Sequence, residues 1–79
     1  MTKLKKNIDK LHATEMGRNH IKRNLQIEVN DVVQWCRARI LEEDAKIERN
    51  EKNWYITVDN CRITINARSY TIITAHTIT

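Results

Sequence analysis

Residues 53–66 read Asn-Trp-Tyr-Ile-Thr-Val-Asp-Asn-Cys-Arg-Ile-Thr-Ile-Asn, two alternating runs that meet at Asp59 and Asn60. If these two residues form a tight loop, the runs pair as antiparallel strands, because Asp and Asn tolerate the positive φ of hairpin turns. The apolar pairs are then Val58 with Cys61, Ile56 with Ile63 and Trp54 with Ile65, and the polar pairs are Thr57 with Arg62, Tyr55 with Thr64 and Asn53 with Asn66. Successive strand side chains point to opposite faces, so this hairpin has one apolar face and one polar face.

Three helical segments in the N-terminal half are expected to cover the apolar face. Residues 3–11 carry leucine and isoleucine at helical spacing, with lysines on the other side. Residues 14–25 begin with a threonine suited to cap a helix, although Gly17 could instead end the first helix, and the sequence leaves both readings open. Residues 30–41 form a third helix with Asn30 as its cap, followed by an acidic loop.

Strand patterns fill the rest of the chain. Ala45–Arg49 alternates and is predicted to be the first, edge strand, and Tyr70–Thr77 is predicted to be the fourth. Helices followed by an antiparallel meander predict an α+β fold with the helices on one sheet face. The 79 residues are expected to form one domain, with a helical part at 1–42 and a sheet at 45–78.

The loop between the third and fourth strands decides which side chains share the polar face. A three-residue loop, Ala67 to Ser69, would place Tyr70, Ile72, Thr74 and His76 on that face, with Ile65 opposite Thr71, Ile63 opposite Ile73 and Cys61 opposite Ala75. A two-residue loop would reverse the faces and bury polar groups, which costs free energy unless each finds a partner. We predict the three-residue loop, even though it lacks the glycine that such loops usually carry.

Composition and charge narrow the function classes. The formal net charge of +4 favours an anionic partner such as RNA, with a merely solvated basic surface as the alternative. Cys36 and Cys61 are isolated at apolar positions, which predicts buried free thiols. We expect no metal or cofactor, because metal-ligand spacings and Gly-rich phosphate loops are missing. With no membrane-length apolar run and no signal-peptide core, a cytoplasmic protein without a membrane partner is expected.

Two groups of side chains carry candidate chemistry. On the predicted polar face, His76 can exchange protons near neutral pH, Arg62 can bind phosphate, and Tyr55 and Tyr70 can stack on bases. Thr57, Thr64, Asn66 and Thr74 complete that face. The second group lies on the helices and suits phosphate contact: His12, Arg18, His20, Lys22 and Arg23. For each residue the alternative is an ordinary solvated surface.

Five motifs spread over nearly the whole chain carry a resemblance. They are Leu11-His-x-Thr-Glu-x-Gly17, Ile21-Lys-Arg-Asn-Leu25, Asp31-Val-Val-x-Trp-Cys36, Lys52-Asn-Trp-Tyr55 and Ser69-Tyr-Thr-Ile-Ile-Thr-Ala-His76. The chain thereby resembles a small family of uncharacterised short bacterial proteins, a domain of unknown function. This resemblance identifies relatives and implies no activity.

A helical histidine with spaced arginines after it, and a meander ending in Thr-Ile-Ile-Thr-Ala-His76, also resemble the barnase/EndoU/colicin/RelE-like superfamily of small α+β ribonucleases. That resemblance implies RNA on the open sheet face and metal-independent attack of the ribose 2′-OH on the adjacent phosphate. No arginine directly precedes Met16, which departs from the commoner pattern. The residues carried over from the resemblance as catalytic are His12, Arg18 or Arg23, Thr74 and His76, with Tyr70 as a further candidate. The residues expected to bind RNA come from the polar sheet face, and they are Arg62, Tyr55, Tyr70, Thr64 and Asn66.

Two functions from different classes follow. The first is a metal-independent endoribonuclease, or a toxin-like protein of that fold, acting on RNA through the open sheet face. The second is a non-catalytic module that binds RNA or a protein partner, for example a small inhibitor of a nucleic-acid-processing complex; fold likeness alone does not separate the two. The chain is expected to be a monomer, or a homodimer joined through the edge strands at Ala45–Arg49 or Tyr70–Thr77.

Overall fold

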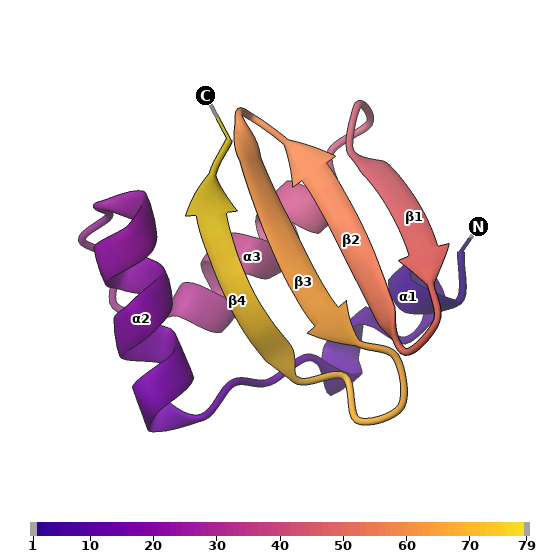
Figure 1. Ribbon diagram of the computed structural model, residues 1–79, viewed down its shortest axis with the longest axis horizontal. Coiled ribbons are helices and arrows are strands. Elements are labelled where there is room, and N and C mark those ends of the chain that lie inside the picture. The colour runs from indigo at the N-terminus through magenta and orange to yellow at the C-terminus, as the bar shows by residue number, and fades with distance from the viewer. Residues whose placement is uncertain (1, 79) are drawn as a thin grey trace.

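Four antiparallel strands form a single sheet that follows the helices in the chain (Figure 1). The computed structural model describes residues 2–78. The helices are α1 (Lys3–Lys6), the 3-10 helix η1 (Ile8–Lys10), α2 (Glu15–Leu25) and α3 (Val32–Ile40), and the strands are β1 (Lys46–Asn50), β2 (Asn53–Val58), β3 (Cys61–Asn66) and β4 (Ile72–Thr77). Neighbouring strands in the chain are also neighbours in the sheet. The predicted α+β architecture, with helices before an antiparallel meander, is confirmed.

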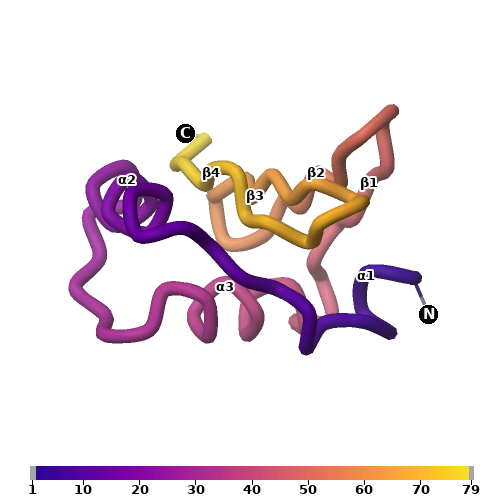
Figure 2. Tube along the Cα trace, turned by 90° about the horizontal axis from the view of Figure 1, so that it is seen from below, coloured from indigo at the N-terminus to yellow at the C-terminus, as the bar shows by residue number. Residues whose placement is uncertain are grey.

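The described helices leave one face of the sheet uncovered (Figure 2). Figure 2 shows α3 in a layer beneath the strands and α2 beside the edge formed by β4. The core between these layers holds the apolar side chains of the inner sheet face and of the helices. Its fully buried members are Leu4, Ile21, Val32, Cys36, Ile40, Ile56, Ile63, Ile65 and Ala75. Within residues 2–78, no helix is long and apolar enough to cross a membrane.

The central hairpin forms as its alternation predicts. All six predicted pairs between β2 and β3 occur in register, from Asn53 with Asn66 to Val58 with Cys61. The turn residues Asp59 and Asn60 have φ of 50° and 61°, the left-handed conformation that a tight hairpin requires. Trp54 is 4% exposed, which confirms its predicted place in the core.

The last hairpin differs from the prediction of a three-residue loop. The Tyr70 N–H donates to the Asn66 carbonyl and the Asn66 N–H donates to the Thr71 carbonyl, both at 2.9 Å, so residues 67–70 form a four-residue loop. Tyr70, with φ of 62°, takes the left-handed position in place of a glycine. The fourth loop residue shifts the register by one residue, so Ile65 pairs with Ile72, and a β-bulge further along β4 adds a second residue, so Cys61 pairs with Thr77 instead of Ala75. Beyond the bulge the total shift is even, so Thr74 and His76 stay on their predicted face.

The predicted faces are reversed at the start of β4, between the four-residue loop and a β-bulge. Thr64 pairs with Thr74 but Ile65 pairs with Ile72, so Ile73 is the extra residue. Tyr70 and Ile72 are therefore buried, 6% and 1% exposed, whereas Ile73 is 47% exposed. The placement of Tyr70 and Ile72 on the polar face, and of Ile73 on the inner face, was wrong. The one-residue shift of the loop buries a tyrosine ring and an isoleucine, and the bulge then restores the parity so that the polar residues that follow stay outside.

The predicted single helix over residues 3–11 is interrupted at Asn7. The Asn7 side-chain amide donates to the Lys3 carbonyl at 3.0 Å, and its backbone N–H donates to the Lys3 and Leu4 carbonyls. Asparagine favours such local bonds over helix continuation, so α1 ends there and η1 follows. Leu4 and Leu11 still reach the core.

The ends of the other helices follow their capping side chains. Thr14 caps α2 as predicted, because its hydroxyl accepts the Gly17 N–H at 3.0 Å, and α2 runs on through Gly17 to Leu25. At α3 the predicted cap, Asn30, is wrong by one residue. The Asp31 carboxylate accepts the Gln34 N–H at 3.0 Å and is the cap.

Candidate nucleic-acid interface

The sheet face opposite the helices, here called the outer face, is built from three rows of side chains. Residues directly opposite each other in antiparallel strands share a face, so the strand registers define each row. The rows are Lys46–Thr57–Arg62–His76, Glu48–Tyr55–Thr64–Thr74 and Asn50–Asn53–Asn66–Thr71. No helix lies over this face in the described residues (Figure 2). A partner could therefore contact all three rows without displacing an element of the fold.

The first row gathers cationic and titratable groups. Arg62 and His76 are exposed and lie directly across from each other on β3 and β4. The Arg62 guanidinium also lies over the Tyr55 ring, 5.3 Å from its centroid, a cation–π contact that holds the guanidinium above the sheet. Lys46 completes the row on β1, with its amine 3.9 Å from the Glu48 carboxylate.

Most of the predicted sheet-face residues are brought together here. Thr74 lies opposite Thr64 in the second row, and Asn66 lies in the third row. Thr64 is only 8% exposed because the neighbouring side chains cover it at the centre of the face. The Thr64 hydroxyl is therefore less accessible to a ligand than the side chains around it.

Tyr70 does not belong to the outer face. Its ring packs in the core, 5.2 Å from the Trp54 ring centroid, and the Lys10 amine lies 5.7 Å from the Tyr70 centroid. A buried ring cannot stack on a base that approaches from the outer face. The predicted RNA contact of Tyr70 is therefore removed.

His12 lies at the opposite end of β4 from His76. Its backbone pairs with the β4 edge at Thr71, because the His12 N–H donates to the Tyr70 carbonyl and the His12 carbonyl accepts the Ile72 N–H. Thr71 precedes His76 by five residues, or about 16 Å at about 3.3 Å per residue. The two histidines consequently do not face one phosphate.

Arg18 and Arg23, the other predicted catalytic residues, are exposed on α2. Because α2 lies beside the β4 edge, these arginines flank the sheet instead of standing in its rows. The structure thus divides the predicted catalytic set among the outer face, the N-terminal segment and α2.

A hydrogen-bonded chain joins His12 to the loop after β3. His12 Nε2 is 2.9 Å from the Thr71 hydroxyl, which is 2.7 Å from the Ser69 hydroxyl, and Ser69 donates to Asn66 Oδ1 at 3.2 Å. On the other side of the ring, His12 Nδ1 is 3.0 Å from the Lys10 carbonyl. A carbonyl only accepts, so Nδ1 carries a hydrogen.

The Thr71–His12 pair was not predicted, because the two residues are 59 positions apart. Ser69, which has no base partner in the sequence, gains one only through this chain. A hydroxyl, an imidazole and an orienting carbonyl are also the parts of an activated nucleophile. Here they tie the N-terminal segment to β4 and fix the side chain of Asn66.

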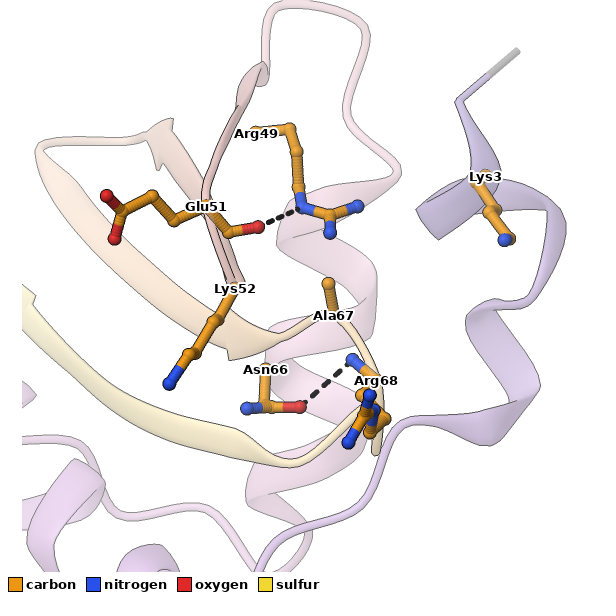
Figure 3. A pocket seen from close by; sticks show the side chains of 7 residues that line it. All are labelled: Lys3, Arg49, Glu51, Lys52, Asn66, Ala67 and Arg68. Atoms are coloured by element: carbon orange, nitrogen blue, oxygen red, sulfur yellow. Dashed lines mark hydrogen bonds between the residues drawn. The ribbon is translucent and has the colours of Figure 1, made fainter.

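A second surface lies at the end of the sheet where the β1–β2 turn and the β3–β4 loop meet α1 (Figure 3). It is a cavity of about 500 Å³, here called the basal pocket. The residues that line it are Lys3, Arg49, Glu51, Lys52, Asn66, Ala67 and Arg68. Of these, sequence reasoning had singled out only Asn66, because the others come from segments whose meeting depends on the finished fold.

An acidic cluster stands at the opposite end of the sheet. One carboxylate oxygen from each of Glu42, Asp44 and Asp59 lies within 4.8 Å of the others. Arg39 Nε is 2.6 Å from Glu42 and 3.6 Å from Asp59, so a cation already lies among these carboxylates. A side-chain hydrogen bond with Asp59, followed by desolvation, raises the pKa of Glu42 above its ordinary value, and this outweighs the opposing effect of Arg39.

Comparison with known protein families gives one result. The model of a family described as "Protein of unknown function (DUF3781)" matches residues 5–76. The chain has no significant match among curated proteins or among solved structures. The matched range includes the whole outer face and all of the basal pocket except Lys3.

Proposed function

The chain belongs to the DUF3781 family, whose description names no activity, and we propose that it binds single-stranded RNA across the outer face of its sheet. The observation that carries the proposal is the placement of Arg62 between Tyr55 and His76 on a face that no described helix covers. These three side chains provide a fixed cation, an aromatic surface and a titratable donor within adjacent strands.

The chemistry of these groups matches the parts of an RNA strand. A guanidinium donates two parallel hydrogen bonds to a phosphate, and an aromatic ring offers a surface on which an unpaired base can stack. The net charge of +4 attracts a polyanion before contact is made. Single strands are favoured over duplexes because their bases are free to turn toward the sheet.

RNA cleavage is a second candidate function, favoured by the direct pairing of Arg62 with His76. Attack of the 2′-OH on phosphate needs a base, an acid and a cation beside the phosphorane. His76 supplies one proton-transfer group and Arg62 supplies the cation. His12, about 16 Å away along β4, does not supply the other proton-transfer group. We therefore favour RNA binding over RNA cleavage as the function of the outer face.

The binding proposal is tested with fluorescence anisotropy of an unstructured oligoribonucleotide labelled at its 3′ end, titrated at several salt concentrations. Arg62→Gln removes the central cation, and Arg37→Gln on α3 is the matched control because it removes the same charge from the helical layer. A charge-assisted hydrogen bond contributes about 1.5–3 kcal/mol, so Arg62→Gln is expected to weaken binding about tenfold or more. Equal losses in both variants would show that net charge, and not the outer face, holds the RNA.

The cleavage proposal is tested in the same samples with EDTA present. Products with 2′,3′-cyclic phosphate ends that disappear in His76→Ala, with binding retained, would support it. Cleavage that persists in His76→Ala would remove His76 from the mechanism. Absence of products from the wild type would leave binding as the function of this face.

A further inference from the structure

We propose that the basal pocket binds a phosphate monoester dianion. This site is separate from the outer-face residues Arg62, Tyr55 and His76, and it does not depend on RNA binding by them. Its lining contains four cationic side chains, Lys3, Arg49, Lys52 and Arg68, and one carboxylate, that of Glu51.

The cations of the basal pocket come from four different segments: α1, the end of β1, the β1–β2 turn and the β3–β4 loop. Figure 3 shows the Glu51 carboxylate extending away from the Arg49 guanidinium, so the single acid does not stand between the cations. A cavity lined mainly by one sign of charge raises the local concentration of counter-ions. The basal pocket is therefore an attractor for anions.

Arg49 is held in place by contacts that, within residues 2–78, leave most of its donors unused. Its Nε donates to the Glu51 carbonyl at 3.0 Å, and the guanidinium lies 5.5 Å from the Trp54 ring centroid. The bond uses one of five N–H donors, and the two terminal amino groups carry the other four. A guanidinium whose orientation is already fixed loses little entropy when it binds a phosphate in a bidentate manner.

The loop on the other side of the basal pocket is also fixed before a ligand arrives. Asn66 Oδ1 accepts the backbone N–H groups of Arg68 and Ser69, both at 2.9 Å, and the Ser69 hydroxyl at 3.2 Å. The Ala67 N–H donates to the Lys52 carbonyl at 2.7 Å and joins this loop to the β1–β2 turn. Because the acceptor end of the Asn66 amide is occupied, the end that remains is a donor, which suits an anion.

The excess of cations favours a dianion over a singly charged group. A phosphate monoester carries a charge of about −1.5 to −2 at neutral pH, whereas each internal phosphodiester of RNA carries one negative charge. The cavity volume of about 500 Å³ lies within the range of pockets that hold small organic ligands, so the phosphate can carry an attached nucleoside. Such a monoester is found both in free nucleotides and at the phosphorylated end of an RNA strand.

The proposal is tested by amide NMR titration of the full chain with inorganic phosphate, with uridine monophosphate, and with an oligoribonucleotide that has either a 5′-phosphate or a 5′-hydroxyl. Saturable shifts are expected at Arg49, Ala67 and Arg68. Arg68→Gln should weaken phosphate binding about tenfold or more, whereas Arg62→Gln on the outer face should leave it unchanged. The Arg68 side chain takes no part in the described loop hydrogen bonds, so this variant keeps the fold, and Lys3→Gln is a second probe that spares the Arg49–Trp54 contact.

The outcomes separate the two sites. If Arg62→Gln loses RNA binding but still binds phosphate, both proposals are upheld. If the wild type binds phosphate but no variant changes RNA binding, only the basal-pocket proposal is upheld. Stronger binding of the 5′-phosphorylated strand identifies RNA ends as the source of the monoester, and binding of uridine monophosphate without that difference identifies free nucleotides. Equal shifts with chloride at matched ionic strength, or an Arg68→Gln titration equal to that of the wild type, would overturn the proposal.

Discussion

Replacing Trp54 by alanine tests where the core of this small protein lies. Trp54 is 4% exposed, and its ring contacts Tyr70 at 5.2 Å between centroids and lies under Arg49 at 5.5 Å. Truncating a buried tryptophan costs about 3–5 kcal/mol, a figure that includes the lost aromatic pair. At about 0.05–0.15 kcal/mol per residue, a 79-residue domain has a free energy of unfolding of about 4–12 kcal/mol. Trp54→Ala should therefore remove a large share of the stability.

The assay is urea unfolding followed by far-UV circular dichroism, with a thermal melt as a second measure. Each kcal/mol lowers the Tm of a domain of this size by about 4–8 °C, so a fall of about 12–40 °C is expected for Trp54→Ala. Trp54→Phe keeps a ring in the core, so its smaller loss of stability can still be measured if the alanine variant fails to fold. Trp35→Ala is the matched control, because Trp35 is half-buried on α3 with Arg39 over its ring at 5.2 Å. Its loss should cost about 1–2 kcal/mol, since a smaller part of the ring leaves water on folding.

A Trp54→Ala variant as stable as the wild type would refute this reasoning. So would a greater loss in Trp35→Ala than in Trp54→Ala. Either result would mean that the inner sheet face is not the main buried surface of the protein.

Two further predictions follow from titratable groups. Burial raises the pKa of Cys36 to about 12 and also raises the pKa of Cys61, whose thiol donates to the Val58 carbonyl at 2.9 Å. Neither thiol should therefore react with Ellman's reagent at about pH 8 until urea unfolds the chain, and rapid labelling of the folded protein would contradict this. Because the raised pKa of Glu42 makes its ionisation harder in the folded state, stability should fall as pH rises from the ordinary value of 4.5 through the folded value. Glu42→Gln should therefore raise the Tm near pH 7 and leave it unchanged below about pH 4, and a lower Tm at neutral pH would show that the ion pair with Arg39 dominates.

The central hairpin could be predicted because two independent signals agree on one register. Alternation along β2 and β3 pairs every apolar residue with another, and Asp59 and Asn60 suit the tight turn that this pairing requires. A register error of one residue would have turned Trp54 outward, so the burial energy itself specifies the pairing.

The last hairpin could not be predicted in the same way. Ile72 and Ile73 are consecutive apolar residues, so the alternation is broken where the bulge occurs, and either one could face the core. The left-handed residue of the loop is Tyr70, which sequence rules do not favour there. The four-residue loop is favoured because the Tyr70 ring can then pack on Trp54, a contact between the β3–β4 loop and β2, which are not neighbours in the sequence.

The outer face could be predicted from the sequence, whereas the basal pocket could not. Arg62, Thr74 and His76 could be placed on one face from strand parity alone, and the register shift of two residues preserved that parity. The basal pocket forms where α1 contacts two hairpin ends, and a local sequence pattern does not predict contacts between segments so far apart in the chain. Arg49, which alternation assigns to the inner face, reaches this pocket because β1 is an edge strand.

The most direct test of RNA binding by the outer face is the salt dependence of oligoribonucleotide affinity for the wild type, Arg62→Gln and Arg37→Gln. Each phosphate contact on a single strand contributes about 0.7 to the slope of log K against log salt concentration. We expect the slope to become shallower by about 0.7 in Arg62→Gln, with binding about tenfold weaker, and to keep its wild-type value in Arg37→Gln. No measurable binding by the wild type at low salt, or the same slope and affinity in all three proteins, would contradict an RNA interface on this face.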